Sequence, residues 1–248
     1  MDKASTGLRP QSHLQTKKAP ILLSIQAGQI ALPAAAHLPA IVPAPVVVCS
    51  HGLLSAKESP KLIAVCEALS QAGFCSIRFD FSGCGHSAKR SKSYLIDQRR
   101  QDLAWVIEFV RKQPWWDGRP VGLFGSSLGG FLSLLAANEH PQAIGPVVSW
   151  SAPFSIGSKH PVEIESANFA EGVGFPADLA ALEQARNVLL IHGQCDELVP
   201  WTESVQIYKR LKDPKKLVVL RSADHRISDP SWRNTAIGQT VDWFYRER

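Results

Sequence analysis

The sequence predicts an α/β protein with a mostly parallel central sheet and helices on both faces. Short apolar runs alternate with segments whose apolar residues recur every three or four positions, the alternation that βαβ units produce. A Gly-Ser-Ser-Leu-Gly sequence at residues 125–129 joins one such run to a helix-like segment. Polar residues directly follow two later runs, which places them at the carboxyl edge of the same sheet.

In the first half of the chain, turn residues separate the predicted elements. A starting hairpin is expected with Gly28 in its turn, because glycine tolerates the positive φ of tight turns. Gly73 marks the end of one predicted helix and Pro114 the end of the next. The predicted elements are strands 21–24, 30–32, 46–50 and 75–79, a helix over about 60–72, and a helix whose apolar face carries Leu103, Val106, Ile107 and Val110.

The second half continues the alternation of strands and helices. The helix predicted over 131–138 is apolar nearly all round, so we expect it to lie buried in the middle of the domain. The remaining predicted elements are strands 121–124, 147–150, 188–191 and 217–220, a helix over 202–211, and a last amphipathic helix between Trp232 and Phe244. That last helix should close over one face of the sheet.

The length of the chain fits a single domain. A chain of 248 residues is long enough for one large α/β domain and short for two. Residues 1–18 are polar and mildly basic, and we expect a loose tail there, before a domain over 19–248. Residues 151–187 contain several glycines, prolines and acidic residues. This segment predicts a small cap of one or two brief helices, with a long solvated loop as the alternative.

Composition and charge exclude several classes of protein. Hydrophobic residues make up 45% and charged residues 20%, which excludes disordered and fibrous chains. The net charge is +5, but the basic residues form short, separated runs, so we expect no nucleic-acid partner. Prolines interrupt the apolar stretch 30–49, which argues against a membrane helix. The five cysteines have neither paired nor metal-type spacing, so reduced thiols in a cytoplasmic protein are expected.

The Gly-Ser-Ser-Leu-Gly sequence places Ser127 at the apex of a sharp strand-to-helix turn. A serine at such a turn, called a nucleophile elbow, attacks carbonyl carbons, and its small neighbours let the strand and the helix approach closely. The N–H of Leu128 would begin the helix, where the helix dipole favours a developing negative charge. A glycine-rich loop that only reverses the chain is the alternative interpretation.

An acid and a histidine follow two later strands. Asp196 comes just past one predicted strand, and His225 comes just past the next. A serine hydroxyl needs a base that works near neutral pH, and a carboxylate orients that base. We therefore predict a triad of Ser127, Asp196 and His225. Asp224 is an alternative acid, although neighbouring side chains on an extended segment point apart.

The remaining polar residues near strand ends are expected to have structural roles. Asp80 should cap the turn that follows its strand. His51 and His192, each before a glycine, should tie loops together by hydrogen bonds. The histidines lack metal-ligand spacing, so no metal site is predicted. Cys195 lies beside the predicted acid, but a serine occupies the elbow, so a packing role is favoured over a nucleophilic one.

Three further motifs, together with the elbow, resemble those of the α/β-hydrolase family. They are His-Gly at 51–52, Asp-Phe-Ser-Gly-Cys-Gly-His-Ser at 80–87 and His-Gly-Gln-Cys-Asp-Glu-Leu-Val-Pro at 192–200, in the family's order. The resemblance runs from about Val46 to the C-terminus, and it implies the α/β-hydrolase fold with an oxyanion hole at the backbone N–H groups of Leu53 and Leu128. Within the family, the sequence after His51 looks most like bacterial serine esterases of the cinnamoyl-esterase and serine-aminopeptidase-like branch.

These residues together predict a serine hydrolase that cleaves small or medium carboxylic esters through an acyl-enzyme on Ser127. This chemistry needs no cofactor and no metal. A peptidase or thioesterase with the same triad is one alternative, and a ligand-binding protein that has lost turnover is another. The expected partner is a small-molecule ester, with no nucleic acid and no membrane. The sequence leaves the oligomeric state and the substrate-binding side chains open.

Overall fold

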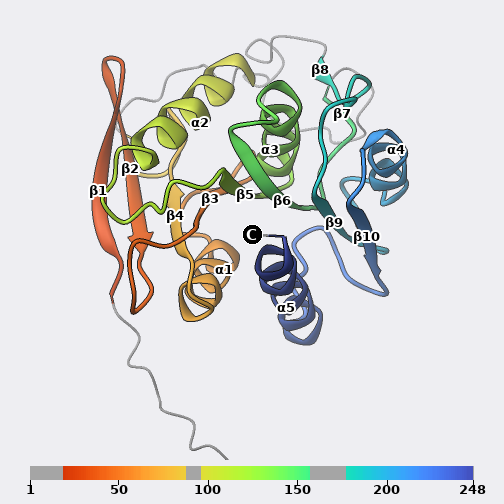
Figure 1. Cartoon of the computed structure of the whole chain (residues 1–248). Coiled ribbons are helices and arrows are strands. Elements are labelled where there is room, and N and C mark those ends of the chain that lie inside the picture. Colours follow the sequence, from red (N-terminus) through yellow and green to blue (C-terminus); the bar gives the residue numbers. More distant parts are fainter. Residues whose placement is uncertain (1–18, 88–95, 157–176, 248) are drawn as a thin grey trace, which may run out of the picture.

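The computed structural model describes residues 19–87, 96–156 and 177–247, and an eight-stranded sheet forms its centre (Figure 1). The strand order is β1-β2-β4-β3-β5-β6-β9-β10. β2 pairs antiparallel with both β1 and β4, while all other neighbours in this sheet are parallel. The mostly parallel sheet predicted from the sequence is confirmed. The strands are β1 (Ile21–Ala27), β2 (Ile30–His37), β3 (Val46–Ser50), β4 (Cys75–Phe79), β5 (Val121–Ser126), β6 (Ile144–Trp150), β9 (Val188–Gly193) and β10 (Lys215–Leu220).

Helices cover both faces of the sheet, as predicted. Figure 1 shows α1 (Pro60–Gln71) and α5 (Pro230–Arg246) on one face, and α2 (Ile96–Val110) and α3 (Leu128–Glu139) on the other. α4 (Thr202–Arg210) packs against β9 and β10. Each face has its own hydrophobic core, because successive strand side chains point to opposite faces of a sheet.

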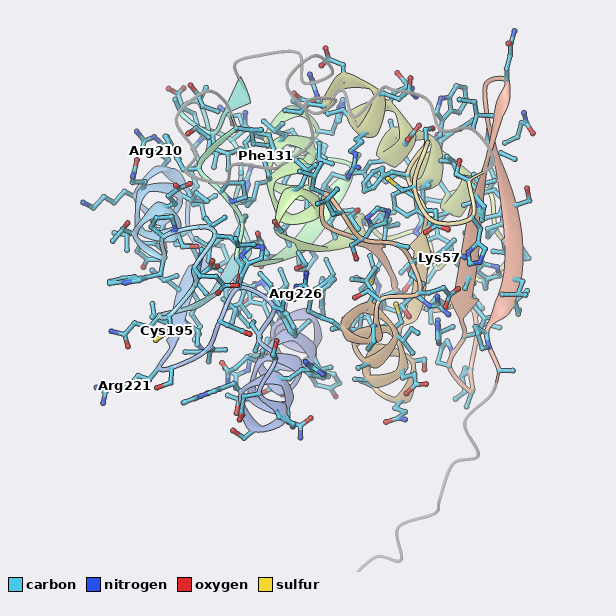
Figure 2. The ribbon with its side chains drawn as sticks, turned by 180° about the vertical axis from the view of Figure 1, so that it is seen from behind. Lys57, Phe131, Cys195, Arg210, Arg221 and Arg226 are labelled. Atoms are coloured by element: carbon cyan, nitrogen blue, oxygen red, sulfur yellow. The ribbon has the colours of Figure 1, made fainter. Side chains whose placement is uncertain are left out.

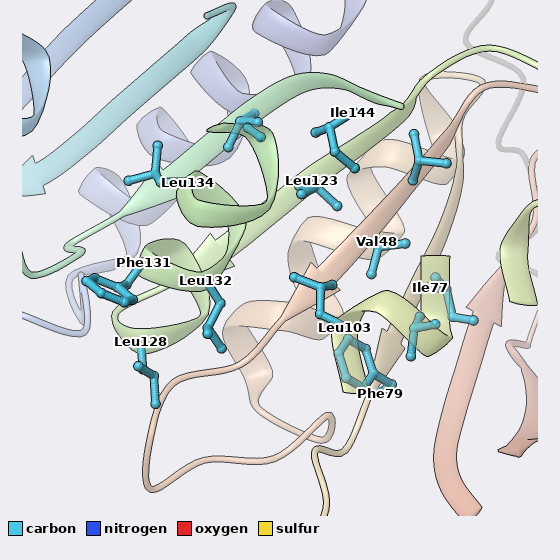
Figure 3. Close-up of a cluster of buried hydrophobic side chains, with 14 of the residues drawn as sticks. Val48, Ile77, Phe79, Leu103, Leu123, Leu128, Phe131, Leu132, Leu134 and Ile144 are labelled. Carbon is cyan, nitrogen blue, oxygen red and sulfur yellow. The ribbon is translucent and has the colours of Figure 1, made fainter. Parts of the chain in front are cut away.

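The helix that follows Ser127 lies in the middle of one of these cores. Figure 3 shows Phe131, Leu132 and Leu134 of α3 in one cluster with side chains from β3, β5 and α2. All three are at most 1% exposed. Burial of each such side chain stabilises the fold by roughly 1.5–3 kcal/mol. The central, buried position predicted for this helix is therefore confirmed, and it gives the serine turn a rigid base.

Local sequence signals explain several element ends. Gly73 follows α1 with φ 91°, a left-handed conformation that glycine adopts at little cost. Asp229 caps the N-terminus of α5, because its carboxylate accepts hydrogen bonds from the N–H groups of Ser231 and Trp232. β3 and β4 have the predicted bounds. α2 begins at Ile96, seven residues before Leu103, the first residue of the predicted apolar face. The sequence pattern did not indicate this start, because the first turn of α2 is largely polar.

Two predicted segments fall wholly or mainly outside the described residues. The loose tail at 1–18 is one, and the cap at 151–187 is the other, since 157–176 are not described. The described flanks of the cap segment form a two-stranded antiparallel pair, β7 (Ser155–Ile156) with β8 (Ala177–Asp178). In the described part of the chain, no helix is both long enough and apolar enough to cross a membrane.

The five cysteines are free thiols, in agreement with the prediction of reduced cysteines. Four of them are buried and contribute to the cores. Cys195 is exposed, so the packing role predicted for it is wrong. Burial raises the pKa of the Cys75 thiol to about 12, which keeps that thiol protonated and unreactive.

Candidate active site

Ser127 stands at a strained turn between β5 and α3. Its backbone has φ 55° and ψ −122°, a conformation that non-glycine residues avoid. The Ser127 N–H donates to the Trp150 carbonyl at 2.7 Å, and the Ser127 carbonyl accepts from the Phe131 N–H at 3.1 Å. A side chain at Gly125 would overlap the backbone of Gly129 at the start of α3. The predicted elbow therefore has the close strand-to-helix approach that its small residues allow.

Asp196 lies just beyond β9 and accepts four hydrogen bonds. Its Oδ1 accepts from the N–H groups of Leu198 at 2.9 Å and Val199 at 2.7 Å. Its Oδ2 accepts from His192 Nε2 at 3.0 Å and from His225 Nδ1 at 2.8 Å. The carboxylate side chain is 0% exposed, so these four donors take the place of water.

The environment of Asp196 favours its ionised form. Burial of the carboxyl by itself raises the pKa, but the hydrogen bonds from His192, His225 and the Val199 N–H outweigh it and hold the pKa well below its usual range. His192 acts here as the loop tie that was predicted, since its Nδ1 accepts from the Ser204 hydroxyl at 2.7 Å. An acceptor that is ionised at neutral pH thus faces His225.

His225 is oriented by this carboxylate. Because Nδ1 donates to Asp196, the neutral ring keeps its lone pair on Nε2, the state that a general base needs. The N–H of His225 donates to Glu197 Oε2 at 3.2 Å, and the N–H of Cys195 donates to the Ala223 carbonyl at 3.0 Å. The loops after β9 and β10 are therefore joined to each other. Asp224, the alternative acid, instead accepts from the Ser228 N–H at 2.7 Å.

Ser127 and His225 lie at the same edge of the sheet. β5, β6, β9 and β10 are consecutive parallel neighbours, so their carboxyl ends and the loops that follow them share that edge. In the described ranges, no hydrogen bond joins Ser127 Oγ to His225 Nε2. Hydrogen bonds between a nucleophile and its base are often long without substrate and tighten in the complex. The structure thus pairs Asp196 with His225 directly, and it places Ser127 on the same edge.

The predicted oxyanion loop lies against Ser127. A side-chain carbon at Gly52 would stand 3.3 Å from Ser127 Cβ, so the loop touches the serine. His51 Nδ1 contacts the Gly52 carbonyl at 2.6 Å, and the Phe81 N–H donates to His51 Nε2 at 3.2 Å. Since a backbone N–H can only donate and a carbonyl can only accept, the proton must be on Nδ1. His51 therefore fixes the peptide whose N–H belongs to Leu53.

His51 is neutral in this position. Burial, together with the nearby charge of Arg99, lowers the pKa of His51 to about 4. The ring is 0% exposed and lies edge-on to Phe81, with 4.9 Å between ring centroids. The predicted loop-tying role of His51 is confirmed by these contacts.

Replacing His51 by phenylalanine should reduce catalysis through the oxyanion loop. The ring would keep its packing, but the Gly52 carbonyl would lose its donor, so the Leu53 N–H would be less firmly aimed. We expect kcat to fall about 10²-fold with little change in KM, the size seen when one oxyanion donor is lost. Steady-state kinetics on a short ester would measure this. His140→Phe, at an exposed histidine, is the control, and an unchanged kcat for His51→Phe would contradict the role.

Asp196→Asn should change how the free energy of unfolding depends on pH. The folded pKa of Asp196 lies below its unfolded value near 3.9, so its contribution to the free energy of unfolding is complete above about pH 4 and is lost as the pH falls further. The difference between the native protein and Asp196→Asn should therefore be largest at neutral pH and shrink below about pH 4. Urea unfolding between pH 2.5 and 7 would measure it, and a difference independent of pH would refute the linkage.

Asp80 has the predicted structural role. Its carboxylate accepts from the N–H groups of Lys57 at 2.7 Å and His86 at 3.0 Å, and it pairs with Lys57 Nζ at 3.2 Å. It thereby joins the predicted oxyanion loop to the turn after β4. Figure 2 shows Lys57 near α1 and β4, on the side of the molecule away from Cys195.

Sequence reasoning missed two charged residues beside the site. Arg99 of α2 is 1% exposed, and its Nη2 donates to the Leu53 carbonyl at 3.1 Å. Arg99 lies four residues before Leu103, on the same face of the helix, and this spacing could have indicated that Arg99 is buried. Lys61 of α1 donates from Nζ to Ser126 Oγ at 2.7 Å. A cation in the first turn of a helix, where the dipole disfavours it, was the signal there.

Three features define an α/β protein of the hydrolase type. They are the strand order of the sheet, the strained serine turn at the end of β5, and the acid–histidine pair beyond β9 and β10. The chain belongs to the α/β hydrolase fold family, whose family model matches residues 45–173. Among curated proteins, it is similar to the mitochondrial palmitoyl-protein thioesterase ABHD10 of Mus musculus, with 28% identity over 214 residues, 75% of this chain and 70% of that protein.

Solved structures share the fold. The Est1E protein of Butyrivibrio proteoclasticus with ferulic acid bound has a TM-score of 0.75 at 20% identity, covering 91% of this chain and 98% of that one. Mouse alpha/beta hydrolase domain-containing protein 10 has a TM-score of 0.71 at 22% identity, covering 91% of this chain and 99% of that one. A dienelactone hydrolase from Anabaena variabilis has a TM-score of 0.73 at 22% identity, covering 94% and 99%. These likenesses confirm the fold that the sequence predicted.

Proposed function

We propose that the protein is a serine hydrolase that cleaves small or medium carboxylic esters through an acyl-enzyme on Ser127. The observation that carries the proposal is the 2.8 Å contact between Asp196 Oδ2 and His225 Nδ1, on the sheet edge where Ser127 stands. A base oriented by a buried carboxylate, at the same sheet edge as a half-buried serine, is the arrangement that activates a hydroxyl.

In the proposed reaction, each described group has one task. Ser127 Oγ attacks the ester carbonyl while His225 Nε2 takes its proton, and Asp196 stabilises the imidazolium that forms. The N–H groups of Leu53 and Leu128 stabilise the oxyanion; the first-turn N–H groups of a helix have no intrahelical acceptor. The alcohol leaves with the proton from His225, and water activated by His225 then releases the acid and frees Ser127.

A thioester substrate is the second candidate. The similarity to proteins named palmitoyl-protein thioesterase favours it, since that relationship spans 75% of this chain. The same serine, histidine and carboxylate would serve, and only the leaving group would differ. A thiolate leaves more readily than an alkoxide, so a thioester depends less on protonation by His225.

A matched substrate panel tests the proposal. The native protein would be assayed with an ester, a thioester and an aminoacyl amide that share one acyl group, and labelled with a fluorophosphonate probe. We expect labelling at Ser127 and ester turnover above the amide. Turnover of the thioester alone would favour the second candidate. Absence of both labelling and turnover would support a ligand-binding protein on the same scaffold.

A further inference from the structure

Lys61 contacts the residue that precedes Ser127. Its Nζ donates to Ser126 Oγ at 2.7 Å, and it stands 6.0 Å from the ring centroid of Trp150 on the neighbouring strand β6. Ser126 is 3% exposed and is the last residue of β5, directly before Ser127. The bond thus ties the first turn of α1 to the residue that precedes the proposed nucleophile.

The surroundings of Lys61 disfavour its charge. Burial, together with the charges of Arg233 and Arg226, lowers the pKa of Lys61 to about 8, although Asp224 and Asp196 act in the opposite direction. Asp196 follows β9, Asp224 and Arg226 follow β10, and Arg233 belongs to α5. Figure 2 shows Arg226 beside α5, near the centre of that view.

The helix itself adds a further cost. A cation in the first turn of α1 opposes the helix dipole, which favours negative charge at this end. An uncharged side chain of similar length, such as methionine, would avoid all three costs. These are the desolvation of the ammonium, its repulsion by Arg233 and Arg226, and its unfavourable interaction with the helix dipole. Residues that break several local rules at once are expected at functional sites. The ammonium of Lys61 is therefore not explained by its contribution to stability.

The hydrogen bond from Lys61 to Ser126 helps to hold the strained backbone of Ser127. Ser127 has φ 55°, and a residue in such a conformation keeps it only when its surroundings hold it from several sides. α3 and β6 hold the turn through the Phe131 and Trp150 backbone bonds, and Lys61 holds the preceding residue from the α1 face of the sheet. We propose that Lys61 is a positioning residue, whose ammonium fixes Ser126 and so holds Ser127 ready for attack at some cost in stability. This inference rests on the proposed function of Ser127.

The bond to Ser126 depends on the proton of Lys61. An ammonium makes a charge-assisted hydrogen bond, about twice as strong as the bond that a neutral amine makes. With a pKa of about 8, Lys61 loses this bond strength as the pH rises from 7 to 9. The activity should therefore decline with a midpoint near pH 8, and a variant without the ammonium should not show this decline.

The test compares Lys61→Met, Ser126→Ala and the double variant with the native protein. We expect each single variant to lower kcat/KM for a short ester and the rate of fluorophosphonate labelling about tenfold at pH 7, in line with the loss of one hydrogen bond to a charged group. The double variant should be no worse than either single one, because both remove the same contact. Lys61→Met should have an unchanged or higher Tm and no decline near pH 8. Lys112→Met is the matched control, since Lys112 is exposed and its Nζ pairs with Glu108 at 3.0 Å.

The outcomes separate this inference from the proposed function. Lys61→Met with the kcat/KM and the pH 8 decline of the native protein would overturn the inference alone. So would Lys61→Met with a lower Tm and activity lost only in proportion to the unfolded fraction, because that pattern indicates a structural role. A native protein that neither turns over any ester nor reacts at Ser127 would overturn the proposed function and this inference with it.

Discussion

Ser127→Ala should lower kcat on the preferred ester by about 10⁴-fold or more, to a rate near background. The variant removes the hydroxyl that is proposed to form the acyl-enzyme, while His225, Asp196 and the proposed oxyanion loop stay in place. The alanine adopts the same turn, and the strain at φ 55° is unchanged, so circular dichroism and Tm should match the native protein. Steady-state kinetics, with active-site labelling as the second readout, would measure the loss.

A matched control makes this result specific to Ser127. Ser70→Ala removes another hydroxyl, one that donates to the Glu67 carbonyl near the far end of α1. It should leave kcat and labelling at native values. Turnover by Ser127→Ala above one tenth of the native rate would eliminate Ser127 as the nucleophile.

Asp196→Asn should produce the second largest loss, about 10⁴-fold in kcat at neutral pH. An asparagine amide in place of the carboxylate would donate to His225 Nδ1, which moves the ring proton to Nε2 and removes the acceptor for the proton of Ser127. We expect the variant to fold, because the asparagine side-chain oxygen can still accept from the N–H groups of Leu198 and Val199. Kinetics between pH 6 and 9 would measure the loss.

Asp224→Asn is the matched control for Asp196→Asn. Its carboxylate accepts from the Ser228 N–H at 2.7 Å and has no contact with His225 Nδ1 in the described structure. We expect kcat to change less than about threefold, the size of ordinary surface effects. The reverse ranking, with Asp224→Asn the more damaging, would transfer the role of the acid to Asp224.

The sequence was sufficient for the fold and for the acid–histidine pair because both depend on chain order and backbone periodicity. Parallel strands place their following loops at one edge, so topology puts Asp196 and His225 in neighbouring loops of that edge. Strand positions such as 46–50 were readable from their continuous apolar runs. The elbow was readable because only small residues allow β5 and α3 to approach so closely.

Side-chain contacts between distant elements were not readable in this way. Nothing in the periodicity of α1 indicates that Lys61 reaches Ser126, since the distance depends on how α1 packs against the sheet. The same holds for Arg99, whose partner Leu53 lies 46 positions away. The four donors around Asp196 depend on a turn of the loop at Leu198 and Val199 that no strand or helix pattern specifies.

The four donors around Asp196 have a practical consequence for experiments on this protein. Because its pKa is held well below the usual range, the carboxylate remains ionised in the mildly acidic solutions in which many crystals grow. Crystals obtained near pH 5 should therefore retain the ionised Asp196 carboxylate and its hydrogen bonds to the loop N–H groups.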